Sequence, residues 1–530
     1  MRERAAVAPP WASPPWPGSV AGWRRRCWPL TLDHVWLAAL LAFAWVVGVA
    51  LQADQPDYWW TVKLGDLLLA TGQLPTADPL SFTATRGPYI EQQWLAQLVL
   101  ATVHRLGGLE AALVLRGALL VATTALVYAI CRWYGAHTAA ATGACGLALL
   151  SVVGGAAIRP QLFALPLFAL FLLATTAAAG RAWTLGALPP AMAAWANLHG
   201  SFPLGIGLVG LALAGRALAL PPRAWAGDRP LRRLALLVAL CGLAPLANPY
   251  GLGLVPWLVD YLRYNTGATG LATLSEEWLP TSVGTAHGVL FFLQVALLAT
   301  LLVRVGPPPA ADCLRLLGFA ALALQALRST VWWALVMAPV LAWALTRLAS
   351  GARAPALGGS DRRGVPVVNA LLVGCFGLVA LLALPWLRPY GLLFGPERWP
   401  VQDTALPVAA ADYAATLPAT QLFNHMDWGG YLAWRLAPRQ RVFIDGRFQL
   451  YEPARYRDYF RIARAGADWE ARLAAHGVQA LVLDRRADAP LLQALAASGR
   501  WRVAYCDPLA AVYIPRAVDE PQGVDCAPRE

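Results

Sequence analysis

The sequence predicts an α-helical polytopic membrane protein with a C-terminal α/β domain on the outer side of the membrane. Of the 530 residues, 58% are hydrophobic and 14% are charged, whereas soluble proteins carry about 25% charged residues. Most apolar residues before position 390 form blocks near the roughly 20 residues that span a bilayer. The net charge of +12 comes mainly from arginines in short loops between these blocks, so it does not indicate a nucleic-acid partner.

The N-terminal segment 1–32 is predicted to be a cytoplasmic tail. It has no short apolar core followed by a small-residue cleavage site, as a signal peptide would. Block 34–51 is therefore interpreted as a retained first span, and the arginines at 24–26 place its start inside by the positive-inside rule. Residues 52–108 then form a large outer loop. Within it, segment 92–106 is short and polar for a span, and we expect an interfacial helix there.

Further blocks complete an arrangement of about eleven spans over residues 33–390. Charge bias supports this topology, because the inner loops hold about 18 Lys and Arg residues and the outer loops about six. The spans expected after the first are 109–131, 138–157, 160–179, 183–197, 200–215, 233–247, 285–303, 314–327, 330–346 and 366–386.

Residues 391–530 are predicted to form an extracytoplasmic α/β domain, because short β-rich runs alternate with helical stretches. Cys506 and Cys526 could pair in a disulfide if this domain is exported to an oxidising compartment. Strands are expected at 420–424, 441–445, 479–484, 501–505 and 510–514, and helices near 407–416, 428–436, 452–464, 468–476 and 489–498.

Cations collect on the outer face in this topology. Arg116, Arg159 and Arg328 lie beside apolar sequence near the outer ends of spans, so each needs an anionic partner. That partner is either a protein carboxylate or a phosphate, which arginine binds through its planar fork. Three arginines on one face favour the phosphate, and Lys63 adds a fourth cation.

Acidic residues collect on the same face. Asp54 and Asp57 open the outer loop, where a carboxylate could be the general base for an acceptor hydroxyl or, with Glu277, hold a divalent metal such as Mg²⁺ or Mn²⁺. Asp57 could instead only cap a helix. A turn role for Asp78 and a structural hydrogen bond for His199 are the competing interpretations. The residues expected to help at the site or meet an acceptor are Asp78, Glu91, His199, Glu277 and Trp278.

This arrangement resembles the C-type fold of membrane glycosyltransferases, the GT-C fold. Its members include protein O-mannosyltransferases, aminoarabinose transferases and the oligosaccharyltransferase catalytic subunit. In that superfamily a first span is followed by a large outer loop that opens with the catalytic Asp. An interfacial helix and an arginine near the outer end of the next span then follow. Asp57 with Asp54 near it, segment 92–106 and Arg116 occupy those places here. The resemblance implies a polyprenyl-phosphate-linked sugar donor and transfer on the outer face.

A second resemblance lies in the tail. Segment 424–431, Asn-His-Met-Asp-Trp-Gly-Gly-Tyr, resembles the Trp-Trp-Asp-Tyr-Gly motif with which oligosaccharyltransferases contact the hydroxyl residue of the acceptor sequon. The run Arg-Val-Phe-Ile-Asp-Gly-Arg at 441–447 resembles the strand ending in Asp of the same family. The paired tryptophans are absent here. The resemblance implies that Asp427, Asp445 and Arg447 face the acceptor.

The sequence therefore predicts an integral-membrane glycosyltransferase of the bacterial inner membrane, acting on a protein, glycan or lipid acceptor. Asp57 and Asp54 would carry catalysis, and Lys63 would join the three arginines around the donor phosphate. A transporter or flippase of a lipid-linked or anionic substrate is a second hypothesis, although charges at one face disfavour a midplane site. A non-catalytic envelope assembly or sensor protein is the third.

Overall fold

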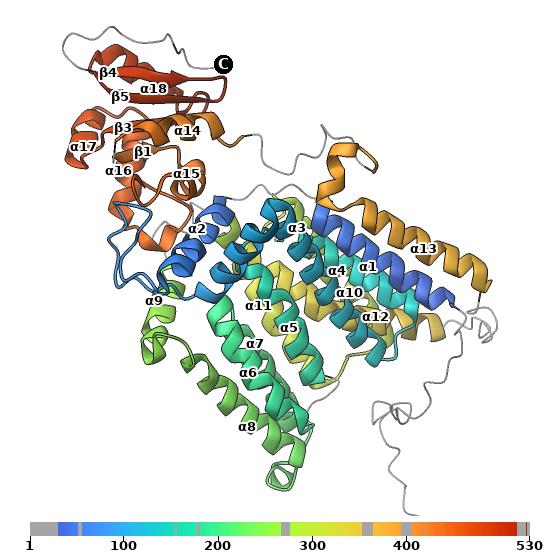
Figure 1. Ribbon diagram of the computed structural model, residues 1–530. Helices are drawn as coiled ribbons and strands as arrows, with labels where there is room; N and C mark the ends of the chain where they lie inside the picture. Colours follow the sequence, from blue (N-terminus) through green and yellow to red (C-terminus); the bar gives the residue numbers. More distant parts are fainter. Residues whose placement is uncertain are drawn as a thin grey trace, which may run out of the picture.

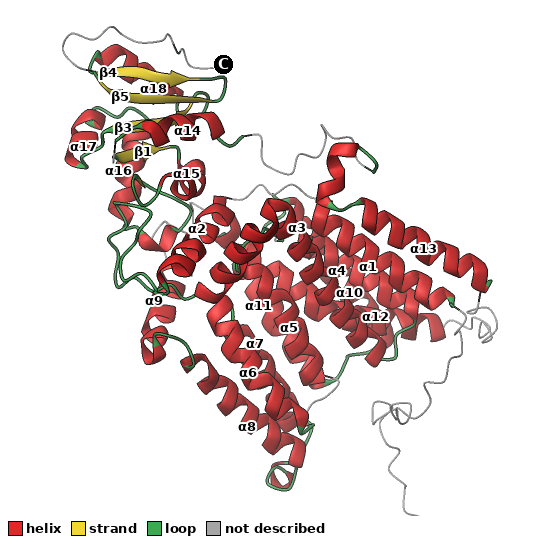
Figure 2. Cartoon of the chain, in the orientation of Figure 1, coloured by secondary structure: helices red, strands yellow, loops and turns green. Residues whose placement is uncertain are grey.

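The computed structural model describes residues 30–50, 56–153, 156–176, 181–266, 276–351, 364–393, 405–418, 420–516 and 526. A bundle of helices, α1 to α13, carries a smaller α/β domain at one end (Figures 1 and 2). The helices of the bundle are α1 Leu32–Ala50, α2 Pro56–Thr71, α3 Trp94–Trp133, α4 Thr138–Val153, α5 Gln161–Thr176, α6 Trp183–Leu198, α7 Pro203–Leu218, α8 Arg229–Leu243, α9 Leu254–Thr266, α10 Ala286–Val305, α11 Ala310–Gln325, α12 Thr330–Gly351 and α13 Pro366–Leu382.

Each predicted span coincides with a helix of this bundle, but the count of eleven spans is not confirmed. Within the described ranges, only the helices at Leu32–Ala50, Trp94–Trp133, Ala286–Val305 and Leu327–Ala349 are long and apolar enough to cross a membrane. Helices α8 and α9, bent by 102°, form a fifth if they are taken together. A 16-residue helix such as α4 or α5 rises only about 24 Å, which is less than the hydrocarbon thickness of a typical bilayer.

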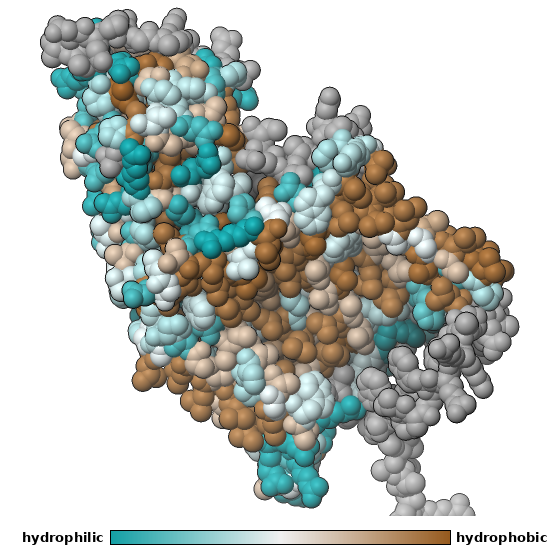
Figure 3. All heavy atoms as spheres, in the orientation of Figure 1, coloured by the Kyte–Doolittle hydropathy of each residue, from teal (hydrophilic) through white to brown (hydrophobic). Residues whose placement is uncertain are grey.

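Hydrophobic side chains form a band over the helical bundle. Figure 3 shows this band, with hydrophilic residues gathered on the tail domain and at the turn between α7 and α8. That turn contains the pair Arg216–Asp228, whose atoms lie 2.7 Å apart, and it lies at the opposite end of the bundle from the tail (Figure 1). The two polar ends thus lie on either side of a surface suited to lipid.

Helix α3 breaks at Gly107 and Gly108. Gly108 has φ +66° and ψ −157°, a conformation open to glycine because it has no Cβ. The segment up to Leu106 and the segment from Leu109 are therefore separate helical halves joined at a kink. The break predicted between a helix at 92–106 and a span at 109–131 is confirmed. The position of the first half at a membrane interface stays a prediction.

The tail folds around a five-stranded sheet of order β2-β1-β3-β5-β4. Strands β1, β2 and β3 are mutually parallel, whereas β5 runs antiparallel to both β3 and β4. All five predicted strands and all five predicted helices are present, and Cys506 is bonded to Cys526, a pairing that the sequence left open. Their bounds are α14 Val408–Thr416, β1 Gln421–Asn424, α15 Gly429–Leu436, β2 Arg441–Val442, α16 Pro453–Ala463, α17 Trp469–Ala475, β3 Ala480–Asp484, α18 Ala489–Ser498, β4 Trp501–Cys506 and β5 Ala510–Pro515.

The tail and residues 56–108, which are called the outer loop below after their predicted location, share one hydrophobic core. Trp59 of α2 is 4% exposed, and its ring packs 5.2 Å from that of Tyr431 and 4.6 Å from that of Trp434, both on α15. Ser81 of the outer loop also pairs in parallel with Val442 of β2, which extends the edge of the sheet. Trp59 therefore packs the outer loop against the tail.

Candidate functional site

A pocket of about 900 Å³ lies where the helical bundle meets the tail. Its walls come from the start of α2, the segment before α3, the α4–α5 and α6–α7 connections, α9, and the ends of α11 and α12. The 3₁₀ turn η5 Glu276–Trp278 and the tail residues 446–449 complete the walls. The polar ends of many elements thus converge on one cavity, which makes it the default candidate for a binding site.

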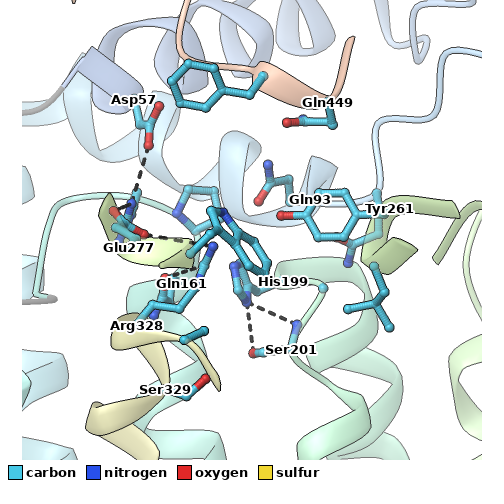
Figure 4. Close-up of a pocket in the computed structure, with 18 of the residues that line it drawn as sticks. Asp57, Gln93, Gln161, His199, Ser201, Tyr261, Glu277, Arg328, Ser329 and Gln449 are labelled. Carbon is cyan, nitrogen blue, oxygen red and sulfur yellow. Dashed lines mark hydrogen bonds and ion pairs between the residues drawn. The ribbon is translucent and has the colours of Figure 1, made fainter. Parts of the chain in front are cut away.

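One side of the pocket is ionic (Figure 4). Arg159 lies between two carboxylates, because its Nη1 is 2.7 Å from Glu277 Oε1 and 3.6 Å from Asp57 Oδ2. Arg328 lies on the other side of Glu277, with its Nη1 3.9 Å from Oε2 and its Nη2 donating to Gln161 Oε1 at 2.8 Å. Its guanidinium also lies 4.4 Å from the ring centre of Trp278. Asp57, Arg159, Glu277 and Arg328 are called the ionic cluster below.

Two backbone hydrogen bonds hold Glu277 and Arg328 of this cluster near each other. The amide of Leu327 donates to the carbonyl of Leu279 at 2.9 Å, and that of Thr281 donates to Leu324 at 3.2 Å. These bonds fasten the chain that follows Glu277 to the 3₁₀ turn that carries Arg328. The two residues are therefore neighbours although 51 positions separate their numbers, which is the difference between 328 and 277.

Asp57 and Glu277 differ in their proton affinity. Burial raises the pKa of Asp57, and Arg159 and the Trp60 hydrogen bond offset this only in part. Burial also acts on Glu277, but Arg159 and Arg328 outweigh it and hold the pKa of that carboxyl below its usual value. Glu277 is thus a fixed anion beside two cations, whereas Asp57 is the more basic carboxylate.

The tail closes over Asp57. Trp60 Nε1 donates to Asp57 Oδ1 at 2.9 Å, which orients the carboxylate. Gly446 lies so close that a Cβ at this position would come within 2.8 Å of the same oxygen. Only glycine allows this approach without displacing the carboxylate.

His199 forms the floor of the pocket and is neutral. Its Nδ1 accepts from the backbone amide of Ser201 at 3.2 Å and lies 2.8 Å from the Ser201 hydroxyl. Burial, Arg328 and Arg159 place the pKa of His199 well below its usual value. With Nδ1 as acceptor, the proton of the neutral ring is assigned to Nε2. The structural hydrogen bond expected for this histidine is present, and the ring also lines the pocket.

The structure brings together two of the three predicted phosphate-binding arginines. Arg116 is absent from the lining of the pocket, and its Nε donates instead to the backbone carbonyl of Gly48 at the end of α1, at 2.6 Å. Lys63 is half-buried on α2 and is also absent from the lining. Asp54 lies outside the described residues. Glu91 does line the pocket, but its carboxylate accepts hydrogen bonds from Tyr89 and Gln97.

Three residues predicted to serve the acceptor form a buried ion triad, and one of them, Arg447, also lines the pocket. Both terminal nitrogens of Arg447 donate to Asp78, at 2.7 and 3.0 Å, and its Nη2 donates to Asp445 at 2.6 Å. The three side chains are at most 3% exposed. Asp78 also accepts from the amides of Leu80 and Ser81, so its predicted turn role is present. The carboxylates of Asp78 and Asp445 are therefore saturated by this pairing, and the triad clamps the outer loop to the tail.

Asp427, the remaining residue predicted from the tail motif, is mostly exposed and does not line the pocket. Its carboxylate lies 3.8 Å from His425 Nε2 in a surface pair, and the opposite nitrogen of that ring lies 3.1 Å from Asp488. The tail meets the pocket through the segment after β2.

Comparison with known proteins shows the fold. No known family and no curated protein matches the sequence. The archaeal oligosaccharyltransferase AglB from Archaeoglobus fulgidus, in complex with an inhibitory peptide and a dolichol-phosphate, aligns with a TM-score of 0.53. The alignment covers 92% of this chain and 75% of that chain at 12% identity. This chain therefore shares its fold with that oligosaccharyltransferase.

Two further solved structures align with TM-scores below 0.5, and the fold does not rest on them. ArnT from Cupriavidus metallidurans, bound to undecaprenyl phosphate, gives a TM-score of 0.49 at 18% identity, over 92% of this chain and 99% of that chain. A second Archaeoglobus fulgidus oligosaccharyltransferase structure, a complex with Zn and sulfate, gives 0.48 at 13% identity, over 91% and 74%.

Of the three expected metal ligands, Asp54 lies outside the described residues. Nowhere in the described ranges do three or more His, Cys, Asp or Glu side chains come together in a way that could hold an ion. Asp57 and Glu277 lie on either side of Arg159, which places a guanidinium between the two carboxylates. The two candidate ligands that the structure describes are therefore neutralised by arginine.

Several pocket residues have no motif that marks them in the sequence. Gln93, Gln161 and Gln449 line the cavity, as do Trp257 and Tyr261 of helix α9. Hydropathy does not predict helix α9, because its 13 residues include Pro256 and polar positions and are too few for a span. The signal available in the sequence is the spacing of Trp257, Tyr261 and Tyr264, which places three aromatic side chains on one face of a helix.

Proposed function

We propose that this chain transfers a sugar from a polyprenyl-phosphate-linked donor to an acceptor at the outer face of the membrane. The observation that carries the proposal is the ionic cluster, in which two arginines and a basic carboxylate share one large pocket beside an apolar helical bundle. The GT-C-like fold supports the same class of reaction.

Arg159 and Arg328 would hold the donor phosphate. Arg328 Nη1 lies 3.9 Å from Glu277, beyond hydrogen-bond distance, so this nitrogen can donate to a ligand. When the bond between the sugar and the phosphate breaks, the leaving polyprenyl phosphate gains negative charge. Fixed guanidinium groups at that point stabilise the developing charge, the usual large term in such catalysis. Glu277 keeps both arginines in place.

Asp57 would act as the general base. The acceptor hydroxyl oxygen attacks the anomeric carbon, its proton passes to Asp57, and the bond from that carbon to the phosphate oxygen breaks. Burial, which raises the pKa of Asp57, makes this carboxylate a better proton acceptor than an exposed aspartate. Trp60 holds one carboxylate oxygen, which leaves Oδ2 near Arg159 facing the reacting groups.

The test is transfer from a labelled pool of polyprenyl-phosphate-linked sugars in membranes that contain the protein. Asp57→Asn should reduce transfer by about 100-fold or more, because a general base typically contributes that much. Asp66→Asn is the matched control, since Asp66 lies on the same helix, pairs with Arg105 and does not line the pocket. Equal transfer by the Asp57→Asn and Asp66→Asn variants would show that Asp57 is not the base.

A further inference from the structure

The side of the pocket opposite the ionic cluster is built from neutral groups. Gln93 from the segment before α3, Gln449 from the tail and Tyr261 from α9 lie together there (Figure 4). Trp257, one turn before Tyr261 on α9, lines the same wall. These four residues come from three separate parts of the chain and are called the neutral wall below.

The two glutamine side chains of the neutral wall are available to a ligand. Two other glutamines of the pocket already use their amides, since Gln161 accepts from Arg328 and Gln92 donates to the carbonyl of Ala196. Within the described part of the chain, no hydrogen bond is formed by the side-chain amide of Gln93 or Gln449. An amide offers two donors and an acceptor, which suits the hydroxyl groups of a sugar.

Aromatic rings complete this wall. Trp257 and Tyr261 are stacked, with ring centres 5.3 Å apart and an angle of 22° between the rings. Tyr261 also meets the edge of Trp278 at 6.2 Å. Aromatic surface next to a few fixed polar groups is the usual composition of a site for a small organic ligand.

The wall offers no counter-ion to a charged ligand. The nearest cation from the tail, Arg447, is neutralised by Asp78 and Asp445. Glu91 is committed to Tyr89 and Gln97. A protonated amine or an ionised carboxylate on a sugar bound against this wall would therefore lose its hydration without gaining a partner from the wall, which is costly.

We propose that the neutral wall is a saccharide subsite that selects an uncharged sugar ring, and this inference rests on the proposed sugar transfer. Gln93 and Gln449 hydrogen-bond the ring hydroxyls, and the aromatic rings of α9 cover its apolar face. The ring belongs either to the donor or to a glycan acceptor, which have the same chemistry at this wall.

The test measures binding without catalysis. The full-length protein is placed in lipid nanodiscs, because maltoside detergents carry sugar rings of their own. Saturation-transfer NMR then compares uncharged methyl glycosides with methyl glucosaminide, at a pH where its amine is protonated, and methyl glucuronide. Only the uncharged glycosides should give a signal. Each of Gln93→Ala and Gln449→Ala should weaken it about two- to ten-fold, the range for one lost neutral hydrogen bond.

Two variants separate recognition from folding. Gln73→Ala changes an exposed glutamine outside the pocket and should leave binding unaltered. Gln449→Glu keeps the side-chain shape but adds a negative charge, so it should give the protonated glucosaminide a signal that the wild type lacks. Binding in both alanine variants equal to that of Gln73→Ala, or no gain by Gln449→Glu, would overturn the proposal.

Further measurements show whether the sugar ring belongs to the donor or to the acceptor. They also separate the proposed saccharide subsite from the proposed sugar transfer. If the subsite holds the donor sugar, a polyprenyl-phosphate-linked sugar should displace the methyl glycoside, whereas farnesyl phosphate should not. If it holds a glycan acceptor, the methyl glycoside should bind beside the intact donor. Asp57→Asn should abolish transfer and preserve glycoside binding. Binding that depends on the two glutamines, without transfer by the wild type, would support the subsite and refute the proposed function.

Discussion

Replacement of Arg447 tests whether the ion triad joins the tail to the outer loop. Arg447→Met keeps an unbranched apolar side chain in place of the aliphatic stem but leaves the buried carboxylates of Asp78 and Asp445 without a cation. Removing one partner from a buried ion pair costs about 3–5 kcal/mol. Both aspartates keep backbone donors, since Asp78 accepts from Leu80 and Ser81 and Asp445 from the amide of residue 447. We therefore expect the lower end, about 3 kcal/mol.

This loss should appear in the docking of the tail, because the triad joins the two parts of the chain. About 3 kcal/mol corresponds to roughly a 100-fold shift of the docking equilibrium. Limited proteolysis in nanodiscs would report the shift as faster release of the tail.

The exposed Arg439 provides the control, and Arg439→Met should change stability by less than about 0.5 kcal/mol. Adding Asp78→Asn and Asp445→Asn to Arg447→Met should restore part of the loss. Equal proteolysis of the Arg447→Met and Arg439→Met proteins would refute the clamp.

Two further predictions concern the site and the tail. Glu277 raises the pKa of Asp57 by like-charge repulsion, so Glu277→Gln should move the acid limb of the pH profile for transfer to lower pH. Its exposed neighbour Glu276 lies outside the pocket, and a shift of the same size in Glu276→Gln would contradict this assignment. Cys506→Ser opens a disulfide that bridges a sequence separation of 20 and should destabilise the tail by about 3 kcal/mol. Thermal unfolding with and without reductant checks this, since reductant should lower the unfolding temperature of the wild type and leave that of the variant unchanged.

The secondary structure of the tail could be predicted from the sequence because each strand is a short apolar run between turn residues. The break in α3 was visible for a similar reason, since the Gly-Gly pair at 107–108 separates a polar from an apolar segment. The number of spans could not be obtained in this way. Hydropathy identifies apolar helices, but several here have only 15–17 residues, and whether such a helix spans depends on tilt and neighbours.

The site was predictable as a region but not as a set of contacts. Alternation of spans placed Asp57, Arg159 and Arg328 on one face, and the structure puts all three in one pocket. The same rule placed Arg116 there, but the rule gives depth along a helix and not the direction of a side chain. Arg116 points to the end of α1. The pairing of Asp78 with Arg447 spans 369 positions, and no local pattern indicates a contact between such distant residues.

The contacts of the tail bear on how the pocket is built. Trp59 against α15, Ser81 on the edge of β2 and the ion triad all tie the tail to the outer loop. Through these ties Gly446 reaches the Asp57 carboxylate and Gln449 reaches the neutral wall. Undocking the tail would therefore remove one wall of the cavity and expose Asp57, which would lose the burial that raises its pKa. The tail thus acts as part of the site itself, and a variant that weakens docking should lower transfer even though every residue of the ionic cluster is intact.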